Sequence, residues 1–191
     1  MKIEDSTGSG RGAKVDSNQR LLVEAVTESE QLESAVRGEA FQVGSGKVTL
    51  TSANESAVLY FKNNEKKDLI ITAINITSSK QTGSSAGVFT AVIYKSGTGL
   101  SAGTSASASN NNFGSNKTLD VDITQGQEAA TVTDGVASGA FFIQEAEFFN
   151  TDVAWILPKG STVAVGVQPG ASNSSMTITI TIEAHIARDD L

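Results

Sequence analysis

A strict alternation of apolar and polar residues over MTITITIEAHIA, residues 176–187, constrains the fold more than any other feature of this chain. Successive side chains of a β-strand point to opposite faces, so the pattern predicts a strand with one buried and one polar face. At about 3.3 Å per residue the strand would run about 40 Å, longer than most strands in globular sheets. We expect so long a strand to extend a sheet into, or to line, a contact between subunits.

Shorter runs rich in β-branched and aromatic residues occupy most of the chain after residue 40, and no helical pattern lies between them. They cover residues 47–51, 57–63, 69–77, 87–95, 118–123, 140–149, 153–157 and 162–168. Turn residues divide them, among others at 150–152 and 158–161. This organisation predicts an all-β fold: an antiparallel β-sandwich of jelly-roll-like topology over residues 41–191.

Residues 1–40 carry a different pattern, with a glycine-punctuated start and two short apolar runs around the turn residues 16–18, which suggest a small hairpin. We expect an extended N-terminal arm that is too small to bury its own apolar side chains and therefore docks on another surface. The docking residues would be Val15, Leu21, Leu22, Val23 and Val26.

The end of this arm predicts one short helix. Thr27 followed by Glu30 makes a capping box, residues 32–36 carry a one-sided apolar stripe, and Gly38 is a typical C-terminal stop.

The segment Ser96–Asn116 has about twenty residues without a strand or helix pattern, which is unusual inside a compact domain. We expect a loop that is either mobile or ordered against another surface. It can be a binding loop or a tolerated surface insertion. Its candidate binding residues are Leu100, Asn110, Asn111, Asn112 and Phe113.

Composition excludes several classes of function. A net charge of −7 disfavours nucleic-acid binding, and the absence of cysteine removes disulfides, thiolate nucleophiles and sulfur-bound metals. We expect no cofactor. The chain shows neither a signal-peptide pattern nor an apolar run long enough for a membrane span, so we expect no membrane partner and folding in a host cytoplasm.

Candidate catalytic motifs are weak. GSGK at 44–47 resembles the end of a phosphate-binding loop, but Phe41 and Val48 stand where that motif requires Gly and Ser or Thr. The single histidine, His185, falls on the polar face of the last strand, where we expect it to be solvated or at an interface.

Two carboxylate pairs remain. Glu145 and Glu147 would project from one side of a strand, as a paired-carboxylate hydrolase requires, but Trp155 and the two tyrosines are too few and too scattered for a carbohydrate groove. Asp120 and Asp122 alternate similarly without a calcium-loop pattern. We interpret both pairs as surface charge, and we expect no enzymatic activity.

Four stretches resemble virion structural proteins of tailed bacteriophages, most closely capsid decoration or cement proteins. They are AKVDSNQRLLVEAVTES, VTLTSANESAVLYFKNNEKKDLIITAINI, LPKGSTVAVGVQP and SMTITITIEAHI. The resemblance implies a small β-sandwich that sits on the virion surface as a homotrimer, with the major capsid protein as its partner. The alternative that it leaves open is a tail, head-fibre or receptor-binding domain whose 96–116 loop contacts a host surface glycan.

Overall fold

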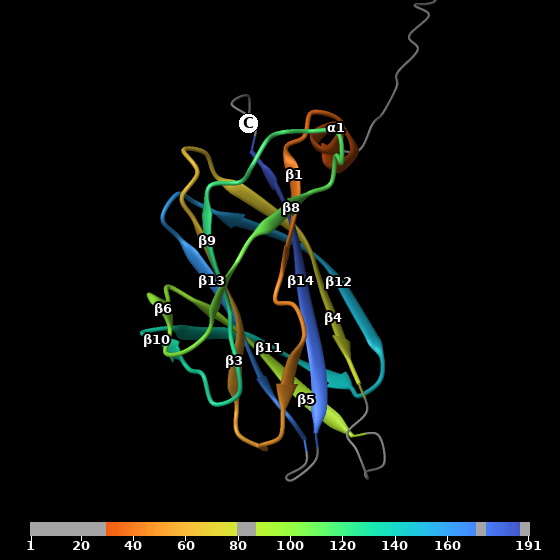
Figure 1. Ribbon diagram of the computed structural model, residues 1–191, viewed down its shortest axis with the longest axis vertical. Helices are drawn as coiled ribbons and strands as arrows, with labels where there is room; N and C mark the ends of the chain where they lie inside the picture. Colours follow the sequence, from red (N-terminus) through yellow and green to blue (C-terminus); the bar gives the residue numbers. More distant parts are fainter. Residues whose placement is uncertain (1–29, 80–86, 171–174, 188–191) are drawn as a thin grey trace, which may run out of the picture. The chain divides into compact units, whose positions relative to one another are not determined.

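The computed structural model describes residues 30–79, 87–170 and 175–187 (Figure 1). The chain divides into two compact units, Met1–Glu30 and Gln31–Leu191, and the second holds the sheets. The predicted docking residues of the arm lie outside the described residues, so their role stays a prediction: Val15, Leu21, Leu22, Val23 and Val26.

Within the described ranges the chain forms one short helix and fourteen strands. In chain order these are α1 (Glu30–Val36), β1 (Ala40–Gly44), β2 (Val48–Leu50), β3 (Ser56–Asn63), β4 (Leu69–Ser78), β5 (Val88–Lys95), β6 (Gly99–Leu100), β7 (Thr104–Ala106), β8 (Ala108–Asn110), β9 (Val121–Gln125), β10 (Val132–Thr133), β11 (Val136–Gln144), β12 (Phe148–Leu157), β13 (Thr162–Gln168) and β14 (Met176–Ile186).

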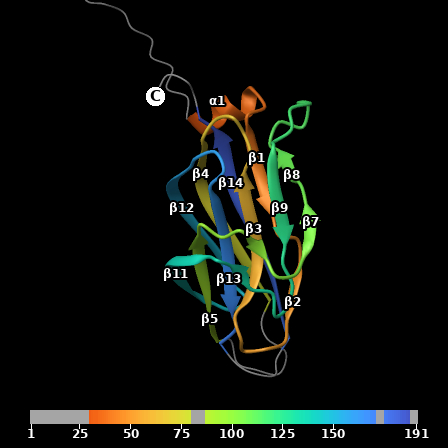
Figure 2. The ribbon, with the colours of Figure 1, turned by 90° about the vertical axis from the view of Figure 1, so that its left-hand side faces the viewer.

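Two antiparallel sheets of six strands each face one another (Figure 2). The first has the order β12-β4-β14-β1-β8, with β2 also pairing with β14, and the second has the order β11-β5-β13-β3-β9-β7. A small ribbon of β10 and β6 accompanies them. The predicted all-β, antiparallel sandwich is confirmed, while its jelly-roll topology stays a prediction.

The core lies between the two sheets, and strand alternation explains its composition. From the first sheet, Ile178, Ile180 and Ile182 point inward from β14, and from the second, Val165 and Val167 point inward from β13; all five are fully buried. Each such side chain contributes about 1.5–3 kcal/mol of burial free energy. The predicted inner face of residues 176–187 is therefore confirmed.

β14 pairs with neighbouring strands of its own sheet along most of its length. One edge pairs with β4, and the other is shared by β1 and then β2. Between those two short strands, Ser45 N–H donates to the Ile180 carbonyl (2.8 Å) and Ile180 N–H donates to the Ser45 hydroxyl (2.9 Å). Both edges of β14 are paired within its own sheet, so it offers no free edge along which a sheet could extend into another subunit; that it lines a subunit contact stays a prediction. The glycine-rich segment 44–47 is the connection that makes this pairing possible.

The chain turns at residues 145–147, between β11 and β12, where the sequence predicted an uninterrupted strand over 140–149. Ala146 has a φ of +63°, and its N–H donates to the Ser78 hydroxyl (3.2 Å). The predicted turn at 150–152 is also wrong, because these residues lie inside β12 and pair with β4. Asn150 and Asp152 are tolerated there because β12 is an edge strand and both side chains are exposed.

The predicted short helix is confirmed as α1, and its end follows the expected chemistry. Gly38 has a φ of +70°, and the Gly38 and Glu39 amides donate back to the carbonyls of Ala35 (2.9 Å) and Ser34 (2.7 Å). Two residues of the predicted apolar stripe, Leu32 and Val36, are exposed, whereas Ser34 is buried. Nearly all of α1 belongs to the same unit as the sheets.

Candidate binding surfaces

The predicted structureless loop 96–116 contains three short strands, so that expectation is wrong. β7 pairs with β9 in the second sheet, and only one residue later β8 pairs with β1 in the first sheet. The segment therefore crosses from one sheet to the other at one border of the sandwich. Its period-two pattern is hidden because each strand has three residues or fewer.

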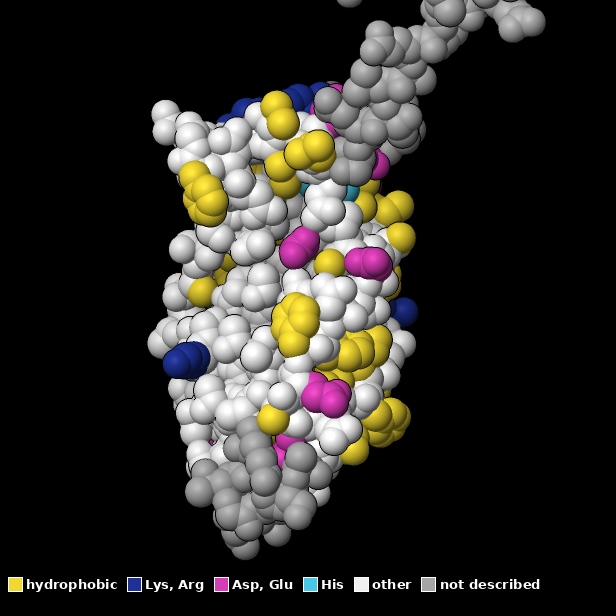
Figure 3. All heavy atoms as spheres, turned by 90° about the vertical axis from the view of Figure 1, so that its right-hand side faces the viewer, with side chains coloured by type: hydrophobic (Ala, Val, Ile, Leu, Met, Phe, Trp, Pro, Cys, Tyr) yellow, Lys and Arg dark blue, Asp and Glu magenta, His cyan; other side chains and the backbone are white. Residues whose placement is uncertain are grey.

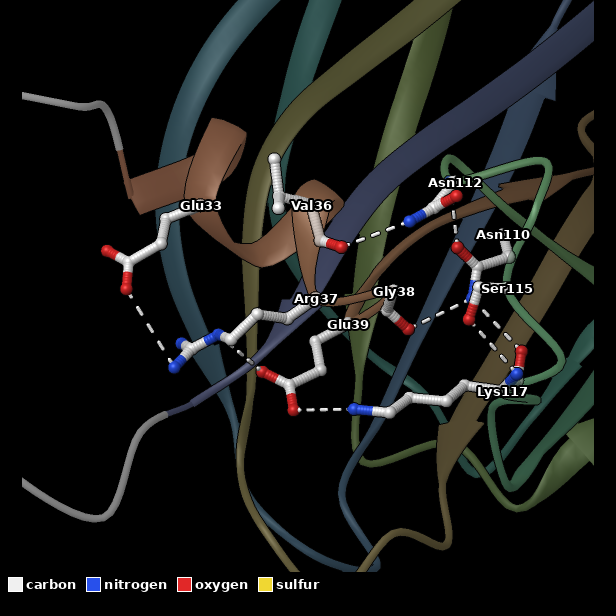
Figure 4. Close-up of polar contacts among 9 residues, drawn as sticks. All are labelled: Glu33, Val36, Arg37, Gly38, Glu39, Asn110, Asn112, Ser115 and Lys117. Atoms are coloured by element: carbon white, nitrogen blue, oxygen red, sulfur yellow. Dashed lines mark hydrogen bonds and ion pairs between the residues drawn. The ribbon is translucent and has the colours of Figure 1, made fainter.

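Residues 110–117, which follow these strands, are ordered against α1 (Figure 4). The Asn110 amide donates to the carbonyls of Gly38 (2.9 Å) and Lys117 (3.0 Å), and the Asn112 amide donates to the Val36 carbonyl (3.0 Å). The bonds to Val36 and Gly38 satisfy carbonyl groups at and just after the end of α1, which have no partner inside the helix. We call α1 together with residues 110–117 the crown.

Charged side chains strengthen the crown. The Lys117 ammonium lies 3.0 Å from a Glu39 carboxylate oxygen, and Arg37 lies 3.3 Å from the other oxygen and 3.8 Å from Glu33. The hydrogen bond from Lys117 is the main cause that lowers the pKa of Glu39 below its usual value. These groups are partly exposed, so each ion pair contributes little to stability by itself.

The crown uses most of the predicted binding residues internally. Asn110 and Asn112 form the bonds above, and Asn111 N–H donates to the Ala40 carbonyl (2.9 Å). Leu100 lies in β6, away from the crown in Figure 1. Phe113 is the exception, because its side chain is 100 % exposed at the loop tip.

A second surface, which we call the apolar edge, is formed by β11 and β12. Each is the border strand of its sheet, and among the described residues β11 pairs only with β5 and β12 only with β4. The edge exposes Val136, Phe142 (77 %), Phe148 (66 %) and Ile156 (67 %). Figure 3 shows hydrophobic side chains gathered in the middle of the outer face of the first sheet and toward its β12 side. Apolar side chains gathered in this way mark an interaction surface.

Between the sheets, the apolar edge opens into a cleft of about 570 Å³ lined mainly by apolar side chains. Trp155, Ile71 and Ile93 lie in its walls, with Lys95 at its lip. From β11 the cleft lining includes only the small residue Ser138, so no large side chain of that strand fills it. The sequence missed this site, although the doubled phenylalanines at 141–142 and 148–149 were a signal, since one of two adjacent strand residues faces outward.

Three aromatic residues that are far apart in the sequence line adjoining hollows at this end of the sandwich. Trp155 and Tyr94 line the cleft, and Tyr60 lines an adjoining hollow of about 600 Å³ that shares Lys95 and Thr162 with it. Burial, and then a 2.5 Å hydrogen bond from the Tyr94 hydroxyl to Glu55, raise the pKa of Tyr94 to about 12. Tyr94 is therefore a neutral donor at physiological pH.

His185 and the carboxylate pairs do not form a reactive group. His185 lies on the predicted polar face but is only 3 % exposed, so the expected solvation is wrong. On the same face of β14, the Gln31 amide of α1 donates to Glu183 (2.8 Å).

Glu145 is buried in the turn before β12, whereas Glu147 is exposed, so the two carboxylates do not share one face of a strand. Asp122 lies 4.0 Å from the Lys62 ammonium, and Asp120 N–H donates to Glu65 (2.7 Å). In the part of the chain that the structure describes, no three His, Asp or Glu side chains are grouped to hold a metal ion. No helix in that part is long and apolar enough to cross a bilayer.

No protein-family model matches the chain, and the search of curated proteins found no significant match. The features of the molecule that bear on its function are therefore the crown, the apolar edge and the cleft.

Proposed function

We propose that this chain is a non-enzymatic structural protein of a tailed-bacteriophage virion that binds as a homotrimer to the capsid surface and stabilises the shell. The observation that carries the proposal is the distribution of exposed apolar side chains. Among the described residues they lie on the crown (Leu32, Val36, Phe113) and along the apolar edge, with Val88 in β5, the strand that pairs with β11. Two separate apolar surfaces suit a protein with two kinds of neighbour, which are further copies of itself and the major capsid protein.

The crown is the surface assigned to the capsid. Within the crown, α1 directly follows residues 1–29 in the chain. We therefore assign the proposed docking residues of the arm and the exposed Phe113 to the same partner. Its loop is held by side-chain bonds to α1, which reduces the ordering entropy lost when a partner binds.

Cryo-electron microscopy of the intact particle tests the proposal. Density for this chain over the capsid lattice is the expected result, and density confined to the tail would overturn it. Added to particles that lack the protein, the full chain should restore occupancy. A full chain with Leu21, Leu22, Val23 and Val26 changed to serine should bind at a small fraction of that level.

A second function, binding a host surface glycan from a tail or head fibre, is favoured by one observation. Phe113 stands fully exposed on a rigid, asparagine-rich loop, and an aromatic ring beside amide groups suits a sugar face. Phe113→Ser separates the two functions. Loss of cell adsorption with normal capsid occupancy would favour the glycan, and loss of capsid occupancy would favour decoration.

A further inference from the structure

The turn between β11 and β12 forms a rigid projection that we call the aromatic corner, residues 141–149. The rings of Phe141 and Phe149 contact each other inside it, with centroids 5.2 Å apart, while Phe142 and Phe148 are exposed. Backbone bonds hold the turn, since Glu145 N–H donates to the Gly87 carbonyl (2.9 Å). The exposed rings are thus presented without a large loss of conformational entropy on binding.

The cleft at the other end of β12 has the complementary properties. Its walls are mainly apolar and include the only tryptophan of the chain, Trp155, and β11 contributes the small residue Ser138 to them. Its volume of about 570 Å³ suits an aromatic side chain together with its neighbours.

The charges beside the two features are opposite. Glu147 is exposed next to Phe148 in the aromatic corner, and Lys95 is exposed at the lip of the cleft. Neither forms an ion pair with another described residue, whereas Lys62 nearby already has Asp122 at 4.0 Å. Two copies of a chain with net charge −7 repel each other, so a contact between copies requires such a local match.

We infer that the aromatic corner of one copy docks into the cleft of a second copy, with Phe148 entering the cleft and Glu147 pairing with Lys95. Each copy offers one corner and one cleft, so a closed ring of copies fills every cleft, as the proposed trimer requires. The inference rests on the homo-oligomer part of the proposed function. The inference also explains why one edge of the ten-residue strand β12 has no partner strand among the described residues.

Sedimentation of the full chain at micromolar concentrations tests the contact, with emission of Trp155 as a second reading. We expect a small multiple of 19.8 kDa, and a shift of the emission to longer wavelength when dilution separates the copies. Phe148→Ser should weaken association by about 30-fold or more, as loss of a central aromatic anchor does. Phe113→Ser, which removes an exposed ring from the crown, should leave association unchanged.

Charge reversal gives the sharper test. Glu147→Lys or Lys95→Glu alone should weaken association about 3- to 10-fold, and the double variant should return to within about 3-fold of the original chain. A melting curve for each variant separates weak association from misfolding.

The outcomes distinguish this inference from the proposed function. A monomer at high micromolar concentration overturns the inference and the homo-oligomer together. If the protein is an oligomer and neither Phe148→Ser nor either charge reversal weakens its association, the inference is overturned and the decoration role stands. Variants that behave as expected, in a protein that fails to bind particles, support the inference and overturn the decoration role.

Discussion

β14 and β12 belong to the same sheet and alternate in the same way, yet they lie in opposite environments. β14 has paired edges on both sides, and its inward isoleucines are fully buried. β12 is the border strand, and three of its inward side chains, Phe149, Val153 and Trp155, are only partly buried. Alternation therefore tells which face a side chain takes, whereas the position of the strand in the sheet decides how deeply that face is buried.

Ile180→Ala should give the largest effect, since it empties a fully buried site at the centre of β14. We expect unfolding free energy to fall by about 2–5 kcal/mol in chemical denaturation. Thr179→Ala, on the other face of the same strand, is the matched control and should cost less than about 1 kcal/mol. Equal costs would mean that β14 is not the central strand described here.

Trp155→Ala should lower the unfolding free energy by about 2–3 kcal/mol. This is less than the loss expected for a fully buried tryptophan, because the side chain already faces the open cleft. Urea titration followed by circular dichroism measures the change, since the variant has lost the fluorescent reporter. A loss as large as that of Ile180→Ala would show that the border strand is packed as tightly as the centre.

Ser45→Ala should cost about 1–2 kcal/mol, because it leaves the buried Ile180 N–H without its acceptor. Hydrogen exchange at that amide should accelerate while exchange in β12 stays unchanged. Ser109→Ala, in the short border strand β8, is the control. If both variants melt alike, Ser45 does not connect the pairing of β1 and β2 along β14.

Ile156→Thr should have the smallest effect, within about 0.5 kcal/mol of the original stability, because the side chain stands exposed on the outer face of β12. Ile178→Thr on β14 makes the same chemical change in the core and should be severely destabilising. A large loss for Ile156→Thr measured on the dissociated monomer would contradict the exposed position.

Much of the candidate site could not be predicted from the sequence, because it depends on contacts between residues that are far apart in the chain. Asn112 was predicted as a binding residue, and in the structure its amide donates to the carbonyl of Val36, 76 positions away. Nothing local to either residue indicates that bond. The turn at 145–147 was missed similarly, because it depends on Ser78 and Gly87 rather than on its own residues, none of which is a typical turn former.

The sequence by itself determined the all-β class, the antiparallel sandwich, the helix end at Gly38 and the inward face of β14, because turn chemistry and side-chain period are properties of neighbouring residues. Only the tertiary structure decided that β12 is a border strand, that His185 is buried and that a cleft opens beside Trp155. These features arise from pairings between distant segments. The free energy of such a pairing depends on which strands meet. The sequence pattern does not reveal this, because the two-residue period is the same in a central strand and in a border strand.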